Sequence, residues 1–153
     1  MSQFDCGKES LNQFLKKYAW QSQQSHGAVT YVAVRDKRVI GYYSVSYGSV
    51  LPDAATERVK KGMGKYPIPV FLLARLAVDK ACQGQGLGYS LLQDALLRAC
   101  KASEEAGLRA VVVDAIDQQA KEFYLRYGFE ASPIDEMRLF LLMKDVKRTL
   151  GLD

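Results

Sequence analysis

Cysteine and long apolar runs are scarce in this sequence, and each scarcity excludes a class of protein or site. The three cysteines, Cys6, Cys82 and Cys100, are odd in number and widely spaced, so they predict neither a disulfide framework nor a metal site. No apolar run approaches the roughly 20 residues that cross a bilayer. The first residues also lack the basic start and the apolar core of a signal peptide. We therefore expect a cytoplasmic protein without a membrane segment or a bound metal.

The net charge is only mildly positive. It amounts to +4, from 21 basic and 17 acidic residues, which is not typical of a dedicated nucleic-acid binder. Lys60, Lys61 and Lys65 nevertheless form a local cluster. Such a cluster is either a solvated face or a surface that attracts an acidic partner such as RNA.

The apolar periodicity predicts one mixed α/β (α+β) domain over residues 1–153, a length that can bury one full core. We expect helices from the cap Ser10 to Gly27 and at 53–61, 89–106 and 118–127, with a short one in the tail. Strands are expected at 28–35, 39–47, 70–79, 108–115 and 139–143. Asp36 and Lys37 are predicted to form a tight turn, and Gly128 to end the last long helix.

A glycine-rich turn, Gln83–Gly88, lies between the apolar strand Val70–Asp79 and a helix. Backbone N–H groups at a helix start lack partners and lie at the positive end of the helix dipole, so this turn is suited to an anion such as a pyrophosphate. A nucleotide P-loop needs Lys and Ser or Thr after the last glycine, but Tyr89 and Ser90 stand there. The G-x-G-x-G spacing also differs from that of a Rossmann turn. An ordinary flexible turn is the alternative.

The spacing of Gln83, Gly86 and Gly88 resembles the Gln/Arg-x-x-Gly-x-Gly/Ala acetyl-CoA loop of the GNAT (Gcn5-related) N-acetyltransferases. Residues 117–129 are similar to the A-x-x-F-Y-x-x-x-G-F signature that closes the core of that family. Residues 4–7, 41–43, 68–70 and 73–79 together resemble the GNAT toxins of toxin–antitoxin pairs. The resemblance covers nearly the whole chain.

The resemblance implies a GNAT fold with a mixed, mostly antiparallel sheet, a splayed central strand and helices on both faces. The first strand is expected to be short or missing, because only three residues precede Phe4. The implied activity is acetyl-CoA-dependent acetylation of the α-amino group of aminoacyl-tRNA, which blocks translation. A ribbon-helix-helix antitoxin and a homodimer are the implied partners. The alternatives are acetylation of a small amine or a protein N-terminus, and a non-catalytic acyl-CoA-binding module.

The resemblance also implies roles for individual residues. The end of the central strand pairs with pantetheine, the glycine turn binds the pyrophosphate, and Tyr124 protonates the departing thiolate. Tyr124 is alternatively a core residue, as we expect of Phe123; neighbours on a helix point about 100° apart, so both cannot face the core. The predicted cofactor-binding residues are Leu76, Ala77, Val78, Gln83, Gly84, Gln85, Gly86, Leu87, Gly88, Tyr89 and Phe123.

No general base is evident in the sequence. The central strand carries no Glu, Asp79 lies at its exit, and nothing places the single histidine, His26, near the reacting sulfur. An α-amino group, with a pKa of about 7.7–8.0, loses its proton far more readily than a lysine at about 10.4. A site without a strong base therefore suits an aminoacyl acceptor, although an ordered-water relay is an alternative.

Two further residues have two interpretations each. Arg75 is expensive to bury unpaired in an apolar strand. It either pairs with Asp114 or Asp117, or joins Lys60, Lys61 and Lys65 in binding the phosphate or terminal adenosine of tRNA. Cys82, beside the turn, is either a reactive thiol or a small residue at the edge of the loop.

Overall fold

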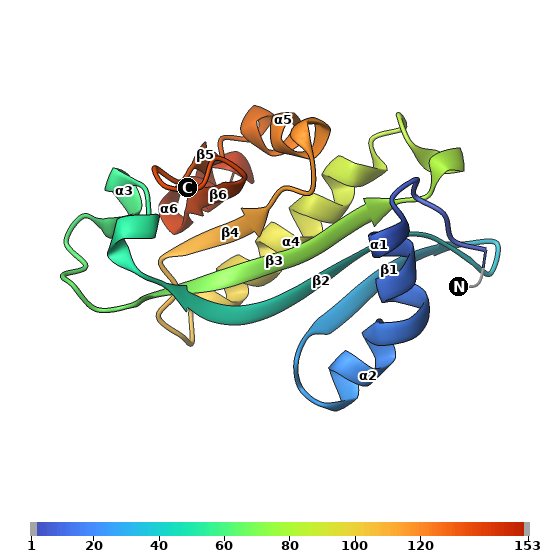
Figure 1. Ribbon diagram of the computed structural model, residues 1–153, viewed down its shortest axis with the longest axis horizontal. Helices are drawn as coiled ribbons and strands as arrows, with labels where there is room; N and C mark the ends of the chain where they lie inside the picture. Colours follow the sequence, from blue (N-terminus) through green and yellow to red (C-terminus); the bar gives the residue numbers. More distant parts are fainter. Residues whose placement is uncertain (1–2, 152–153) are drawn as a thin grey trace. The chain divides into compact units, whose positions relative to one another are not determined.

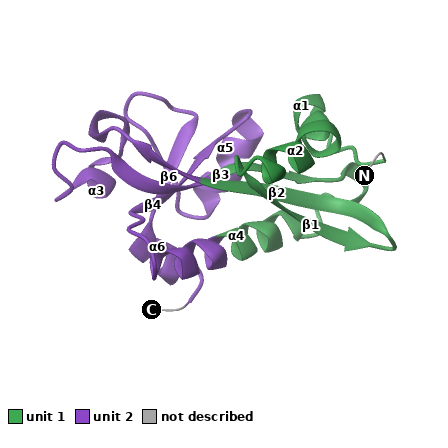
Figure 2. Ribbon diagram, turned by 90° about the horizontal axis from the view of Figure 1, so that it is seen from below, with its two compact units in different colours: residues 1–46, 73–95 green, residues 47–72, 96–153 purple. Residues whose placement is uncertain are grey.

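The computed structural model describes residues 3–151, which divide into two compact units (Figure 2). Unit 1 comprises residues 1–46 and 73–95, and unit 2 comprises residues 47–72 and 96–153. The described strands belong to one six-stranded sheet in the order β1-β2-β3-β4-β6-β5. The two longest strands, β2 (Arg38–Val50) and β3 (Ile68–Val78), each contribute residues to both units.

Unit 1 begins with a helical segment made of α1 (Glu9–Gln13), η1 (Phe14–Tyr18) and α2 (Ala19–Gln24), which lies beside the hairpin of β1 (Val29–Arg35) and β2 (Figure 1). The middle part, η1, is a π-helix. The predicted cap Ser10 is wrong, because the segment starts at Glu9 with Lys8 at the N-cap position. The predicted turn at Asp36 and Lys37 is confirmed, and both residues have positive φ angles, 53° and 63°.

Successive residues of β2 face opposite sides, as the pleat of a strand requires. Tyr42 packs with Phe4 and Phe14 in a buried cluster below the helical segment. Gly41 faces α4 (Leu87–Ser103) instead, and a Cβ atom there would lie 2.9 Å from a methyl group of Leu91. Only glycine therefore allows α4 to approach β2 this closely. Helices thus cover both faces of the hairpin side of unit 1.

Unit 2 is built around β4 (Ala110–Asp114), which pairs antiparallel with β6 (Arg138–Leu142). β6 also pairs with the short strand β5 (Glu130–Ala131), which the sequence did not predict. The first four residues of β4 are buried, as its apolar sequence favours for a strand that is covered on both faces. The remaining elements of unit 2 are η2 (Pro52–Ala54), α3 (Glu57–Lys60), α5 (Gln118–Arg126) and α6 (Met143–Thr149).

Within residues 3–151, the first strand is β1 at Val29, and no strand precedes α1. The prediction of a short or missing first strand also concerns residues 1–2, which lie outside the described part. Of the helices in that part, none combines the length and apolar character needed to span a membrane.

Candidate functional site

The glycine turn of unit 1 follows β3 through the short helix η3 (Lys80–Cys82). Gly84 and Gly86 have φ angles of +79° and +84°, and a Cβ atom added at either would meet nothing within 4 Å. The first turn of α4 includes a hydrogen bond from the Ser90 N–H to the Gly86 carbonyl oxygen, 3.1 Å long. Amides ahead of Ser90 have no acceptor within the helix. The turn therefore has both the open space and the amide donors that an anion requires.

The other predicted cofactor residues of unit 1 flank this turn. Gln85 is exposed, Leu87 is half-buried towards Gly41, and the half-buried Tyr89 accepts a hydrogen bond from Gln93 at 3.1 Å. In the last residues of β3, Ala77 is buried, whereas the flanking residues Leu76 and Val78 are half-buried. The pairing of this strand end with pantetheine stays a prediction.

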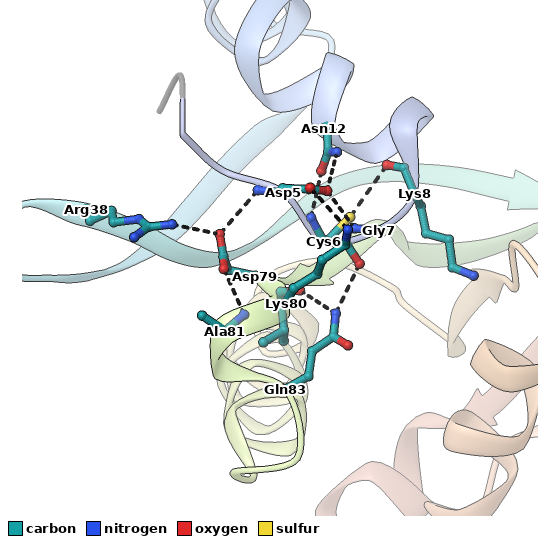
Figure 3. A network of polar contacts seen from close by, with 11 residues as sticks. Asp5, Cys6, Gly7, Lys8, Asn12, Arg38, Asp79, Lys80, Ala81 and Gln83 are labelled. Atoms are coloured by element: carbon teal, nitrogen blue, oxygen red, sulfur yellow. Dashed lines mark hydrogen bonds and ion pairs between the residues drawn. The ribbon is translucent and has the colours of Figure 1, made fainter.

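Asp79 has a structural role that the sequence did not reveal. Its side chain is buried, and its two oxygens accept hydrogen bonds from the Ala81 N–H at 3.0 Å and the Asp5 N–H at 3.2 Å (Figure 3). Arg38 forms an ion pair with it at 3.6 Å. A carboxylate engaged in this way does not serve as a general base. The sequence of residues 4–7 gave no indication of this contact.

Tyr124, on α5 of unit 2, is buried, with only 5% of its surface exposed. Its ring contacts Phe129 edge-on, with ring centroids 5.4 Å apart. Burial raises the pKa of Tyr124 far above that of a free tyrosine. Within residues 3–151, its hydroxyl group forms no hydrogen bond. The hydroxyl oxygen is not among the fully enclosed atoms without a partner, so it keeps some accessible surface.

Phe123 does not occupy the core position that we expected of it. It is half-buried, and the guanidinium of Arg126 lies 5.8 Å from the centre of its ring. The core-facing residue of the pair is Tyr124, because its position on α5 directs it towards Phe129. Its contact with the cofactor stays a prediction.

The acetyltransferase (GNAT) domain family matches residues 26–131 of the sequence. The chain belongs to the GNAT acetyltransferase family. It is 42% identical over 151 residues to the tRNA-acetylating toxin of Mycobacterium tuberculosis, covering 99% of this chain and 90% of that protein. The family, the mixed α/β fold and the acetyl-CoA-dependent acetyltransferase activity are thereby confirmed.

Solved structures of GNAT toxins are also similar. The AtaT toxin complexed with acetyl-methionyl-tRNAfMet superposes with a TM-score of 0.88 at 29% identity, covering 95% of this chain and 89% of that one. A tyrosine-to-phenylalanine mutant of AtaT, bound to acetyl-CoA and the C-terminus of the antitoxin AtaR, gives a TM-score of 0.82 at 28% identity, with coverages of 96% and 88%.

Arg75 of this GNAT chain does not pair with a carboxylate in the described residues, which was one of its two interpretations. Its guanidinium carbon lies 3.7 Å from the centre of the Phe14 ring, and it has no ion pair within residues 3–151. Asp114 instead forms two hydrogen bonds with Arg138, at 2.8 and 3.0 Å. Asp117 accepts a hydrogen bond from the Ala120 N–H at the start of α5. The guanidinium of Arg75 therefore keeps N–H donors for a ligand.

The three predicted lysines lie in unit 2, whereas Arg75 lies in unit 1. Lys60 is half-buried and forms an ion pair with Glu57 at 2.9 Å. Lys61 and Lys65 are exposed. Their positive charges are accessible to an anionic ligand. Lys60 has to break its ion pair with Glu57 before it can bind the same ligand.

Cys82 is almost fully buried beside the turn and accepts a hydrogen bond from Arg35 at 3.0 Å. This burial favours the interpretation of Cys82 as a packed residue at the loop edge over that of a reactive thiol. Cys6 and Cys100 are also free and buried.

Proposed function

We propose that this GNAT enzyme acetylates the α-amino group of aminoacyl-tRNA and acts as a translation-blocking toxin. The 42% identity to a tRNA-acetylating toxin and the similarity to a toxin complexed with acetyl-methionyl-tRNA support this substrate. Among the chain's own features, the observation that carries the proposal is the hydroxyl of Tyr124, which has no hydrogen-bond partner within residues 3–151 although the ring is buried. It argues for a catalytic protein over a non-catalytic acyl-CoA-binding module.

The residues of unit 1 fit the binding of acetyl-CoA, which supplies an activated acetyl thioester. The open space above Gly84 and Gly86 admits a pyrophosphate, and the amides at the start of α4 donate to it. Leu76 and Val78 are half-buried, and their main chain is proposed to pair with pantetheine as an added strand partner. Binding therefore relies chiefly on main-chain groups.

Tyr124 is proposed to hold the proton that the departing thiolate receives. Its raised pKa keeps the hydroxyl protonated at neutral pH and well above. The Tyr124 hydroxyl then donates its hydrogen bond only when the sulfur develops negative charge. An interaction that forms only at that stage stabilises the transition state and not the ground state.

The engagement of Asp79 supports an acceptor that deprotonates easily. The carboxylate of Asp79 is occupied by two backbone N–H groups and Arg38. An α-amino group with a pKa of about 7.7–8.0 is substantially neutral near pH 7.5, whereas a lysine is not. We propose that Arg75, Lys60, Lys61 and Lys65 contact the phosphates or the terminal adenosine of the tRNA.

We also propose the predicted antitoxin partner, the oligomeric state, the location and the domain organisation. A related toxin is bound to the C-terminus of its antitoxin, which supports an antitoxin here, of the ribbon-helix-helix type. A homodimer, a cytoplasmic location and a single GNAT domain over residues 1–153 complete the proposal. The family match supports the single domain, since residues 26–131 include parts of both units.

Labelled acetyl-CoA tests the proposed reaction. The enzyme is incubated with charged tRNA, with deacylated tRNA and with lysine-containing peptides or small amines. Label should appear only on charged tRNA, and mild alkali should release it as N-acetyl-amino acids. Label on amines or peptides alone would establish the alternative substrate class, and binding of acetyl-CoA without any transfer would indicate a non-catalytic module.

The partners require separate measurements. Co-expression with a short ribbon-helix-helix protein encoded next to this chain should restore growth and yield a stable complex. Light scattering on the purified enzyme should give twice the mass of one chain. Growth arrest that the adjacent protein does not relieve would contradict the antitoxin, and a monomeric mass would contradict the dimer.

A further inference from the structure

We infer that the N-terminal segment Asp5–Asn12 positions the glycine turn, and that Gln83 is a positioning residue which holds the turn and leaves the pyrophosphate to main-chain amides. The inference rests on the proposed binding of acetyl-CoA at this turn. It assigns to Gln83 a different role from that of a side-chain ligand. All the residues involved belong to unit 1.

The side-chain amide of Gln83 is already fully used as a donor. Its Nε2 atom donates to the Cys6 carbonyl oxygen at 3.0 Å and to the Val78 carbonyl oxygen at 2.9 Å. An amide nitrogen has only two hydrogens, so neither remains for a phosphate oxygen. The remaining Oε1 atom is an acceptor and offers nothing to an anion. Gln83 therefore ties the turn to both the N-terminal segment and the end of β3.

Asp5 binds the residues just ahead of the turn at three further points (Figure 3). Its carbonyl oxygen accepts from the Lys80 N–H at 2.8 Å, and its carboxylate forms an ion pair with Lys80 Nζ at 3.3 Å. Its own N–H donates to Asp79 at 3.2 Å. Four contacts, including that of Gln83, thus join residues 5–6 to residues 79–83.

Asp5 is itself held firmly by the start of the helical segment. One carboxylate oxygen accepts from the Gly7 N–H at 2.9 Å and from Asn12 Nδ2 at 3.0 Å. The buried Asn12 also accepts from the Cys6 N–H at 2.9 Å. Hydrogen bonds from Gly7 and Asn12 keep the pKa of Asp5 below its ordinary value. The segment is therefore a fixed support and not a loose terminus.

Such a support matters because glycines leave the turn conformationally free. Gly84 and Gly86 have open surroundings, so no side-chain packing fixes them. Ordering a flexible loop on binding reduces affinity, and a loop held in its bound conformation avoids that loss. Contacts immediately before Gly84 limit the conformations that the turn can adopt.

A double-mutant cycle on acetyl-CoA binding tests this inference. Gln83→Met has nearly the same shape but no donors, and Asp5→Ala removes the carboxylate without touching the turn. Each is expected to weaken the affinity for acetyl-CoA, measured by calorimetry, by about tenfold, the loss expected for a few hydrogen bonds. The double variant should bind acetyl-CoA only slightly less tightly than the single variant with the lower affinity, because both substitutions disrupt the same set of contacts. The loss should appear chiefly in the KM for acetyl-CoA, with a smaller change in kcat.

Hydrogen exchange on the ligand-free protein supplies a readout that does not depend on acetyl-CoA. Amides of residues 83–89 should exchange faster in both variants, while β4 and β6 remain protected. The exposed Gln21→Met is the matched control and should leave both readouts at the wild-type level. Asp5→Asn replaces Asp5→Ala should that variant fail to fold.

Two results would overturn the inference. Weak acetyl-CoA binding in Gln83→Met, with wild-type binding and exchange in Asp5→Ala, would make Gln83 a direct ligand. Unchanged affinity and exchange in both variants would remove the positioning role altogether. Failure of the wild-type protein to bind acetyl-CoA contradicts the proposed function instead, and the exchange rates then still decide whether the segment holds the turn.

Discussion

In unit 1, the glycine turn is exposed, and the polar side chains that precede it are engaged in hydrogen bonds and ion pairs with one another. In unit 2, Tyr124 is buried against an aromatic ring, and its one polar atom has no hydrogen-bond partner within residues 3–151. A binding loop needs a defined shape, and hydrogen bonds supply it. A proton donor needs a hydroxyl that is free to donate, and a permanent hydrogen-bond partner would occupy it.

A second tyrosine sharpens this comparison within the same molecule. Tyr42 is as buried as Tyr124 and also packs against aromatic rings. Burial raises the pKa of both. The hydroxyl of Tyr42, however, donates to the Leu11 carbonyl oxygen at 2.7 Å. Burial alone therefore does not separate the two tyrosines, whereas hydrogen bonding of the hydroxyl does.

The largest effect is expected from Tyr124→Phe. The ring packing is retained, so the variant should fold and bind acetyl-CoA normally. Loss of the proton donor should lower kcat by about 10²–10⁴-fold, the usual range for general acid catalysis. Single-turnover acetylation of charged tRNA measures this directly. A wild-type rate would make Tyr124 a core residue like Tyr42.

Gly86→Glu should weaken acetyl-CoA binding by about 100-fold or more. The new side chain fills the open space of the turn, and its charge repels the pyrophosphate by roughly 4 kcal/mol at about 4 Å near a protein surface. Gly64→Glu is the matched control, because Gly64 has a similar φ of +72° and similarly open surroundings. Calorimetry should show normal binding for this control, and equal binding by both variants would contradict the assignment of the turn.

Replacement of Lys60, Lys61 and Lys65 by alanine should raise the KM for charged tRNA by about tenfold and leave that for acetyl-CoA nearly unchanged. Exposed charge contacts contribute about 0.2–1 kcal/mol each. The wild-type tRNA affinity should also fall with salt, with a log–log slope of roughly −0.7 per contact to single-stranded RNA.

A variant with Lys101, Lys144 and Lys147 changed to alanine removes the same charge and serves as the control. Equal KM values for the two variants would show that only the net charge matters. The predicted lysines would then be an ordinary solvated face.

The smallest effect is expected from Tyr42→Phe. The lost hydrogen bond to Leu11 should cost about 1 kcal/mol of unfolding free energy. This corresponds to about 2–4 °C in Tm for a chain of this size. The acetylation rate should be unchanged, so a large loss of rate with normal stability would abolish the contrast between the two tyrosines.

Local signals in the sequence predicted much of the fold. The hairpin turn at Asp36 and Lys37 and the helix end before Gly128 follow from local backbone chemistry, and both are found. The π-helix η1 was not predictable, because its extra residue is set by the packing of Phe14 and Leu15 against distant strands. The two residues of β5 are too few to form a pattern.

The candidate site was predictable where a motif fixed it and not where long-range pairing did. The positions of Gly84, Gly86 and Tyr124 could be assigned from spacing and resemblance. The partner of Asp114 could not, because the register of β4 against β6 places Arg138 opposite it. The roles of Asp5 and Asp79 depend on contacts across 74 positions of sequence.

The burial of the three cysteines has a practical consequence for spectroscopy. Cys6, Cys82 and Cys100 are each no more than 8% exposed, and burial raises the pKa of the Cys6 and Cys100 thiols. Maleimide dyes react with exposed thiolates, so the native protein should take up little label. A single cysteine introduced on the surface, for example at Gln21, can then carry a fluorophore without removal of the native thiols.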